Sequence, residues 1–131
     1  MKRYKGYLIF GGFILILFFA NIIRLDYKLN KINNEYATIL ITDSLDVTIS
    51  SKFFDDDFKY TPSALYLSTS SGRKMLINAE INPKYGNEAV GINDVSEVGD
   101  RIYKQAKNDT IFIYKSVPKG VSDYYFILSK E

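Results

Sequence analysis

Residues Tyr7 to Ile23 read YLIFGGFILILFFANII, a run with no charged residue and one strongly polar residue, Asn21. At the helical rise of about 1.5 Å per residue, this run crosses most of a hydrocarbon core about 30 Å thick. Its length is at the low end of the range of about 17 to 25 residues for a spanning helix. The sequence therefore predicts one transmembrane helix that holds the N-terminus of the chain in a lipid bilayer.

A cleaved secretory signal is the alternative, because such signals also carry a short apolar run. Ala20 suits the last position before a cut, but Phe18 is too large for the position two residues earlier. No cysteine follows the run, which argues against a lipid-modified N-terminus. We therefore expect an uncleaved anchor.

Basic residues flank the run, and the denser cluster precedes it: Lys2, Arg3 and Lys5 before, Arg24, Lys28 and Lys31 after. Positive charge is retained on the cytoplasmic side of a membrane. The expected topology is a cytoplasmic N-terminus and an extracytoplasmic C-terminal part, in the periplasm or at the cell surface. The expected division is residues 1–34 for the tail, anchor and juxtamembrane helix, and residues 35–131 for the exported domain.

The charge of the two parts differs in sign. Residues 1–34 carry six basic residues and one acid, whereas residues 35–131 carry eleven basic and fourteen acidic residues, a net charge of −3. An acidic domain is a poor binder of nucleic acid, because that affinity comes mostly from phosphate neutralisation. The chain has no Cys and no His, so thiol chemistry and the commonest general base are absent. We expect no cofactor and no metal.

A heptad seam of apolar residues begins inside the run and continues beyond it: Leu15, Phe18, Ile22, Leu25, Leu29, Ile32 and Tyr36. One interpretation is a homodimer that pairs two copies through Leu25, Leu29, Ile32 and Tyr36. The other is a juxtamembrane helix that lays this stripe on its own domain. Only about two heptads lie outside the bilayer, fewer than a reliable coiled-coil signal needs, so the second interpretation is favoured. Asn33 and Asn34 are expected to end the helix.

Beyond the helix the apolar period changes to two, as in Leu45-Asp46-Val47-Thr48-Ile49-Ser50. Six short strands are predicted, at residues 45–50, 64–69, 73–78, 101–105, 110–115 and 124–129. A turn at 70–72 and another at 106–109 form two hairpins, and 83–91 and 117–120 are predicted loops. One helical turn is expected at 93–98, with Asn93 as its cap and Gly99 after it. The predicted fold is mainly β: the transmembrane helix, then a small antiparallel barrel or sandwich of about six strands with one short helix.

Gly99 and Asp100 are predicted to form a structural turn between the helical turn and a strand. Gly tolerates a left-handed backbone there, and the Asp carboxylate accepts hydrogen bonds from nearby amides. On this view Gly99→Val destabilises the domain, and Asp100→Asn has a milder effect because the amide keeps one acceptor oxygen.

The stretch from Val98 to Lys104, VGDRIYK, together with Asn108 to Lys115, NDTIFIYK, carries a resemblance. It resembles the C-terminal "VGDSI-K … I-VY" signature of uncharacterised, small, single-pass bacterial envelope proteins. Arg101 stands where such sequences usually have Ser. The resemblance covers about 20 residues, the N-terminal anchor and the overall length. It implies an envelope location and a β architecture, and it brings no catalytic residues.

Aromatic residues are abundant on the predicted C-terminal strands, and Tyr103, Phe112, Tyr114 and Tyr125 form a candidate interaction face. Such a face stacks on a peptide or a sugar. Ordinary strand composition is the alternative explanation, because aromatic residues are favoured in strands and pair across them. The absence of Trp weakens the sugar interpretation.

The densest acid cluster is Asp55-Asp56-Asp57, which invites a hard-cation site. Consecutive acids point in different directions, and no D-x-D-x-D-G loop is present, so a solvated loop is the expectation. No catalytic residue is assigned.

Two functions are compatible with these features. The expected one is a membrane-anchored, extracytoplasmic β domain that is non-enzymatic and binds a partner protein or has a structural role in the envelope. The alternative is a ligand-binding or carboxylate-based catalytic module that acts on an envelope polymer. A cleft that holds Asp100 with Asp94 or Glu97 would favour the alternative; a convex domain with an exposed apolar patch or strand edge would favour the first.

Overall fold

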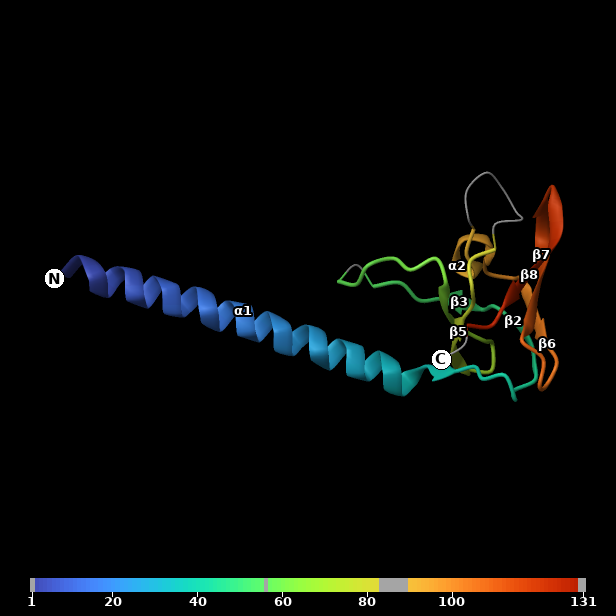
Figure 1. Cartoon of the computed structure of the whole chain (residues 1–131), viewed down its shortest axis with the longest axis horizontal. Coiled ribbons are helices and arrows are strands. Elements are labelled where there is room, and N and C mark those ends of the chain that lie inside the picture. The colour runs from blue at the N-terminus through green and yellow to red at the C-terminus, as the bar shows by residue number, and fades with distance from the viewer. Residues whose placement is uncertain (1, 56, 83–89, 130–131) are drawn as a thin grey trace. The chain divides into compact units, whose positions relative to one another are not determined.

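The computed structural model describes residues 2–55, 57–82 and 90–129. The chain divides into two compact units, Met1–Asn34 and Glu35–Glu131. The first unit consists of a single helix and the second holds every strand (Figure 1).

Helix α1 runs without a break over 34 residues, Lys2–Glu35, and ends one residue past the predicted Asn33-Asn34 boundary. It is long and apolar enough to cross a membrane, by its length and composition. Its large apolar side chains from Tyr7 to Phe19 are each at least half exposed, as suits contact with lipid.

The predicted pairing seam changes in the structure. Tyr36 lies beyond the end of α1, so the helical part of the predicted seam ends at Ile32. Pairing of two copies through Leu25, Leu29, Ile32 and Tyr36 stays a prediction.

The first sheet has the strand order β1-β5-β4-β3: β1 (Ala37–Thr38), β5 (Lys74–Asn78), β4 (Ala64–Ser68) and β3 (Ser51–Lys52). The predicted hairpin of β4 and β5 is confirmed, and Gly72 in its turn has φ of +86°. Strand β1 pairs with β5 in parallel, so the expectation of a wholly antiparallel domain was wrong. Two residues are too few for the period of β1 to be visible in the sequence.

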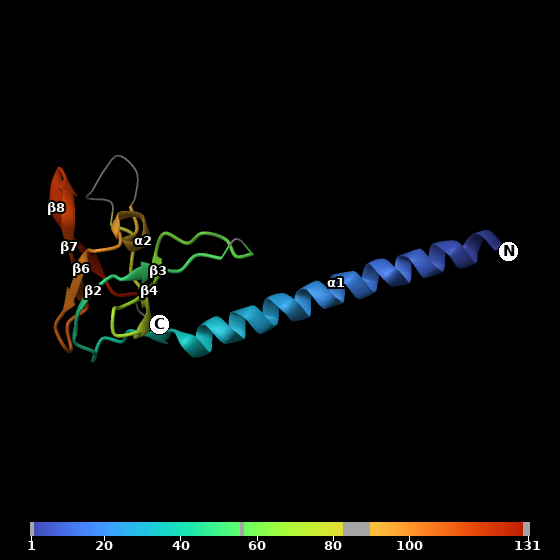
Figure 2. The same cartoon turned by 180° about the vertical axis from the view of Figure 1, so that it is seen from behind.

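The second sheet has the order β2-β6-β7-β8, and all its pairs are antiparallel: β2 (Leu45–Thr48), β6 (Arg101–Lys104), β7 (Thr110–Lys119) and β8 (Val121–Ile127). The predicted loop at 117–120 was wrong, because β7 continues to Lys119 and turns at Gly120, whose φ is +95°. The β7–β8 hairpin is drawn in orange to red in Figure 2.

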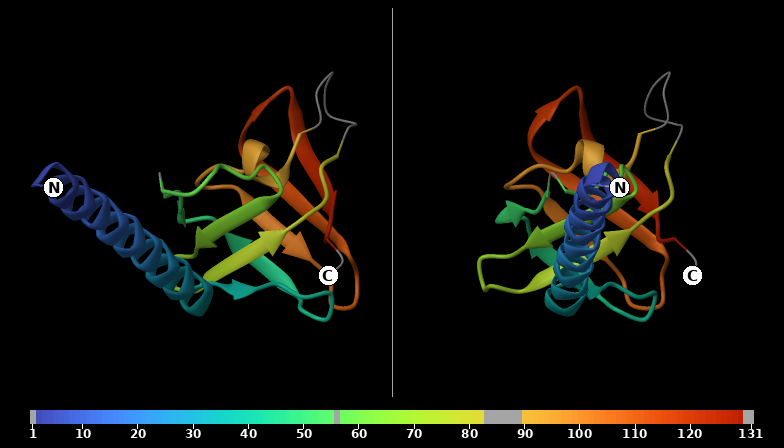
Figure 3. Two further views of the ribbon diagram at one scale, coloured as in Figure 1. Left: turned by 60° about the vertical axis from the view of Figure 1, so that its left-hand side comes forward. Right: turned by 90° about the vertical axis from the view of Figure 1, so that its left-hand side faces the viewer.

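The two sheets are joined at two places. One place is within the strand predicted at 45–50. The Ile49 amide donates a hydrogen bond to the carbonyl of Asp100, the residue before β6 of the second sheet. The next amide, that of Ser50, donates to the carbonyl of Ser68 in β4 of the first sheet. At the other place Ala79 and Leu128 form a bridge. The described strands make two sheets and no closed barrel, so the sandwich alternative of the prediction fits better (Figure 3).

One hydrophobic core lies between the sheets. The alternate residues of the strands turn inward, for example Leu65 and Leu67 from β4 and Ile111 and Ile113 from β7, and all four are fully buried. The opposite residues of each strand face outward, as period two requires.

Helix α2 (Ile92–Val95) begins and ends earlier than predicted, and its N-cap is Gly91 rather than Asn93. A Cβ at position 91 would lie 2.2 Å from the backbone oxygen of Pro62, so only glycine fits there. Most of the predicted loop at 83–91 lies outside the described residues; Asn82 and Val90 at its two ends form an antiparallel bridge.

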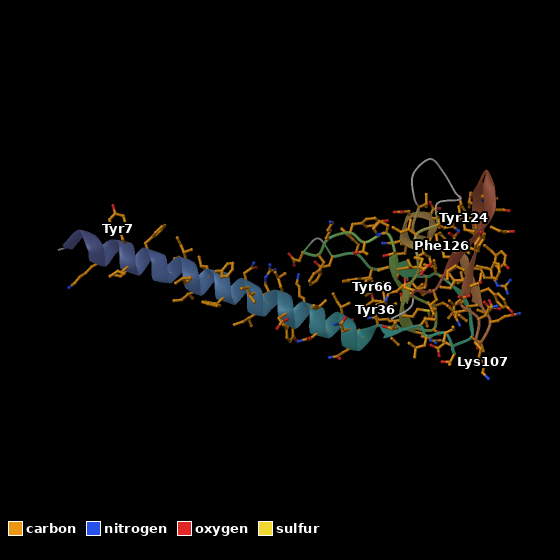
Figure 4. All side chains as sticks on the ribbon, in the orientation of Figure 1. Tyr7, Tyr36, Tyr66, Lys107, Tyr124 and Phe126 are labelled. Carbon is orange, nitrogen blue, oxygen red and sulfur yellow. The ribbon has the colours of Figure 1, made fainter. Side chains whose placement is uncertain are left out.

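The first residues of the domain are fixed to the outer face of the first sheet. The centroid of the Tyr36 ring lies 5.4 Å from that of the Tyr66 ring, and both residues are labelled in Figure 4. The centroid of the Phe53 ring lies 5.6 Å from that of Tyr36. The Lys74 ammonium lies 5.7 Å from the Tyr36 ring and 3.3 Å from the Glu35 carboxylate. Burial raises the pKa of Tyr36, which Lys74 partly offsets.

Candidate functional site

The four aromatic residues of the predicted interaction face lie on one side of one sheet. The strand register places two adjacent rows on the outward side of the second sheet: Asp46, Tyr103, Phe112 and Tyr125 in one row, Thr48, Arg101, Tyr114 and Asp123 in the other. The residues between them along each strand, such as Ile102 and Ile113, point into the core. We call these eight residues the aromatic face.

Arg101 holds the centre of the aromatic face. Its guanidinium donates two hydrogen bonds of 2.8 Å to the two carboxylate oxygens of Asp46. It also lies 5.7 Å from the centroid of the Tyr103 ring and 5.6 Å from that of Tyr114. The hydrogen bond from Arg101 lowers the pKa of Asp46, and the same bond raises the pKa of Arg101.

Sequence reasoning missed Arg101 and Asp46 as members of this face. The two residues are 55 positions apart, and only the pairing of β2 with β6 brings them together. One signal was present: Arg101 lies two residues before Tyr103 in the same predicted strand, and period two places both on one side of it.

The remaining rings of the aromatic face are half-buried and ordered by their neighbours. The Phe112 and Tyr114 rings, two residues apart on β7, are nearly parallel, at an interplanar angle of 12° and a centroid distance of 6.3 Å. The backbone carbonyl of Tyr125 accepts a hydrogen bond from the side-chain amide nitrogen, Nδ2, of Asn82. Asp123 is exposed, its backbone pairs with β7, and its carboxylate forms no ion pair or side-chain hydrogen bond with another described residue.

The predicted turn at Gly99 and Asp100 is the second polar cluster of the domain. Gly99 has φ of +96°, as expected of a glycine in this turn. Asp100 is fully buried and accepts hydrogen bonds from the backbone amides of Glu97, at 2.8 Å, and Ser116, at 3.0 Å. Its carboxylate also pairs with the ammonium of Lys115, a side chain only 8% exposed.

Burial by itself raises the pKa of Asp100, but the hydrogen bond from Lys115 and those from the Ser116 and Glu97 amides outweigh burial, so the pKa lies below its ordinary value. Asp100 is therefore an ionised carboxylate inside the protein. Its role is to tie the turn after α2 to strand β7.

Of the carboxylates considered for catalysis, Asp100 and Glu97 both contact the Lys115 ammonium, but Asp100 is fully buried and so does not face solvent. The Glu97 carboxylate lies 3.6 Å from the Lys115 ammonium, and Asp94 accepts hydrogen bonds from the Tyr60 hydroxyl, at 2.5 Å, and the Gly91 amide, at 2.9 Å. Burial and the bond to Asp94 raise the pKa of Tyr60 to about 12. These acids and Asp100 are engaged with the protein itself.

A pocket of about 650 Å³ lies elsewhere, where β1 and the chain after it diverge from the end of β5. It is lined by Thr38, Ile39, Leu40, Ile41, Thr42, Ser63, Asn78, Leu128 and Ser129, none of which is charged. Leu40 and Ile41 are each 50% exposed. The volume is within the range of about 300 to 1,000 Å³ that small-molecule sites occupy.

The buried side chain of Lys104 binds the backbone of Ile41, one of the residues that line this pocket. Its ammonium donates hydrogen bonds to the carbonyl oxygens of Ile41, at 2.8 Å, Asp43, at 2.5 Å, and Gln105, at 3.1 Å. Burial lowers the pKa of Lys104. Three carbonyl acceptors replace the water that a buried ammonium loses. Sequence reasoning missed this contact, because a lysine on a strand ordinarily points to solvent.

The acid cluster at 55–57 is described only in part, because Asp56 lies outside the described residues. The Asp57 amide donates to the Asp55 carboxylate, which is loop chemistry. Among the residues that the structure describes, no group of three or more Asp or Glu side chains is placed to hold a metal ion.

Comparisons with protein-family models, with curated proteins and with solved structures found no match for this chain. Its function is therefore argued from the geometry of the chain itself.

Proposed function

We propose that this protein is a single-pass bacterial envelope protein whose exported domain binds a partner protein through the aromatic face. The observation that carries this proposal is the gathering of four aromatic side chains and one arginine in two adjacent rows of one sheet. Tyr, Phe and Arg are the residues most enriched at the centres of protein interfaces.

The rigidity of the aromatic face supports the proposal. Arg101 is fixed by Asp46 and by two tyrosine rings, and all eight residues stand on paired strands rather than on loops. A surface that is ordered before binding loses less side-chain entropy when a partner docks. Cross-strand pairing alone explains the rings, but it does not require a guanidinium 5.7 and 5.6 Å from the centroids of two of them.

Membership of the envelope family whose signature the chain resembles is part of the proposal. The resembling residues, Val98–Lys104 and Asn108–Lys115, correspond to the Gly99 turn, strand β6 and the first part of β7. These elements carry much of the aromatic face.

The second candidate function is ligand binding, favoured by the uncharged pocket beside β1. Its exposed Leu40 and Ile41 and its hydroxyl and amide side chains suit a neutral ligand such as a segment of an envelope polymer. We infer no catalysis there, because no carboxylate is among the described residues that line the pocket.

The topology is the first test. A reporter enzyme that is active only after export, fused after Glu131, is expected to be active, because the denser positive cluster precedes the apolar run. The matched fusion to a reporter that works only in the cytoplasm is expected to be inactive. The reverse pattern would contradict the proposed orientation.

The interaction is tested by photo-crosslinking in intact cells. A photoreactive amino acid at Phe112, on the aromatic face, is expected to give one discrete protein adduct. The same amino acid at Ser71, in the exposed turn of the β4–β5 hairpin, is expected to give none. Tyr103→Ser, placed beside the probe at position 112, is expected to remove the adduct because it disrupts the site of Arg101.

A third probe position separates the two candidate functions. Thr42 lines the pocket. A polymer adduct at Thr42, with none at Phe112, would favour ligand binding. Equal labelling at Phe112 and Ser71 would contradict a specific role for the aromatic face.

A further inference from the structure

The aromatic face already binds one guanidinium, its own. Arg101 lies inside its row, with Tyr103 two residues further along the same strand, Tyr114 opposite it on β7, and the Asp46 carboxylate on the diagonal. Two rings and one carboxylate are therefore sufficient on this sheet to contact one arginine side chain.

The other side of Tyr114 repeats most of this arrangement without an arginine. Asp123, on β8, is the cross-strand partner of Tyr114 on β7. Phe112 is the diagonal neighbour of Asp123, and its ring is stacked on the Tyr114 ring. The Asp123 carboxylate is exposed and forms no ion pair with any residue in the part of the chain that the structure describes. Two nearly parallel rings and a carboxylate without a counter-ion thus border the same patch of sheet.

We propose that Phe112, Tyr114 and Asp123 form a binding site for an arginine side chain of the partner protein. This inference rests on the proposed function and names the chemistry by which the partner is recognised. The partner's guanidinium lies over the Phe112 and Tyr114 rings and donates two hydrogen bonds to the Asp123 carboxylate, as Arg101 does on the other side.

The chemistry of the site selects arginine over lysine. A guanidinium is planar, so it stacks on aromatic rings and matches both oxygens of a carboxylate, whereas an ammonium is a compact and strongly hydrated point charge. The net charge of −3 on residues 35–131 also favours a basic segment as it approaches.

The test uses the full chain in nanodiscs of zwitterionic lipid, so that anionic lipid does not compete for basic probes. The probes are two fluorescein-labelled peptides, one with alternating Gly and Arg and one with alternating Gly and Lys, followed by fluorescence anisotropy. We expect the arginine peptide to bind more tightly than the lysine peptide.

Asp123→Asn and Phe112→Leu are each expected to weaken binding of the arginine peptide about two- to fivefold, the range of a cation–π contact at an exposed site. Glu80→Gln is the matched control: it removes the same charge from an exposed side chain outside the aromatic face, and its binding is expected to stay unchanged.

Equal weakening by Asp123→Asn and Glu80→Gln would overturn the site, because the attraction would then depend on net charge alone. Equal binding of the arginine and lysine peptides would overturn it as well. Failure here is distinguishable from failure of the proposed function: a protein adduct at Phe112 that survives Asp123→Asn in cells would keep the interaction face and remove the arginine site.

Discussion

Asp100→Asn is expected to lower the free energy of unfolding of the exported domain by about 3 kcal/mol, near the lower limit for breaking a buried ion pair. The substitution keeps the size of the side chain but leaves the Lys115 ammonium without its buried counter-charge. The Val95 carbonyl and the Glu97 carboxylate still contact Lys115, so the loss is not larger. Thermal or urea unfolding of the full chain in nanodiscs, followed by near-ultraviolet circular dichroism of the tyrosines, measures the change.

Asp46→Asn is the matched control, because it makes the same chemical change in an exposed ion pair. Exposed pairs contribute little to stability, so its effect is expected to be much smaller. Lys115→Met combined with Asp100→Asn is expected to recover part of the loss, since no unpaired buried charge remains. Equal losses for Asp46→Asn and Asp100→Asn would show that the Asp100 pair is not structural.

The pH dependence of stability follows from the same pair. The pKa of Asp100 in the folded protein lies below its ordinary value of 3.8. A lowered pKa contributes stability above the unfolded-state pKa, and this contribution is lost as the pH falls through the folded-state pKa. The wild-type domain is therefore expected to lose stability below about pH 4, and the Asp100→Asn variant to show a flatter profile there.

Ile49→Ala is expected to lower the free energy of unfolding by about 2 to 4 kcal/mol, the usual range for truncating a buried aliphatic side chain. Ile49 is only 1% exposed and belongs to the core. Its backbone also lies where the chain passes from the second sheet to the first, bonded to Asp100 and Gly99. A domain of this size has a stability of only about 5 to 15 kcal/mol, so this one change removes a large fraction of it.

Ile49→Val and Val117→Ala serve as controls for this prediction. Ile49→Val removes one methylene group from the same site and is expected to lower the stability by about 1 kcal/mol. Val117 is 65% exposed near the β7–β8 turn, and its truncation is expected to change the stability by less than about 0.5 kcal/mol. A loss at Ile49→Ala no larger than that at Val117→Ala would mean that residue 49 is not in the core.

The structure changes one expectation drawn from the sequence. Asp100 and Gly99 were both expected to shape a turn, with Asp100→Asn the milder change. The turn is present, but burial against Lys115 makes the charge of Asp100 more important than the acceptor oxygen that an amide would keep. Lys115 is 15 residues away along the chain and on another strand, so no local pattern pointed to it.

The sequence alone was sufficient for the elements whose cause is local. The apolar run predicts α1, because a helix in a membrane needs only continuous hydrophobicity. Alternation predicts β2, two short apolar runs predict β4 and β5, and the turn at Gly72 predicts the hairpin between these two strands. Within β7, period two also places Phe112 and Tyr114 on one face before any partner strand is known.

Tertiary structure decided everything that depends on which strands become neighbours. The parallel pairing of β1, the division of one predicted strand between two sheets at Ile49, and the caging of Lys104 by carbonyls all come from contacts between distant segments. The aromatic face depends on both local and distant contacts. The sequence places its rings on strands. Pairing of β2 with β6 and of β7 with β8 then brings Asp46 to Arg101 and Asp123 to Tyr114. Local patterns fix which side of a strand a residue occupies, but only the packing of the core fixes the order and register of the strands, and therefore which side chains meet.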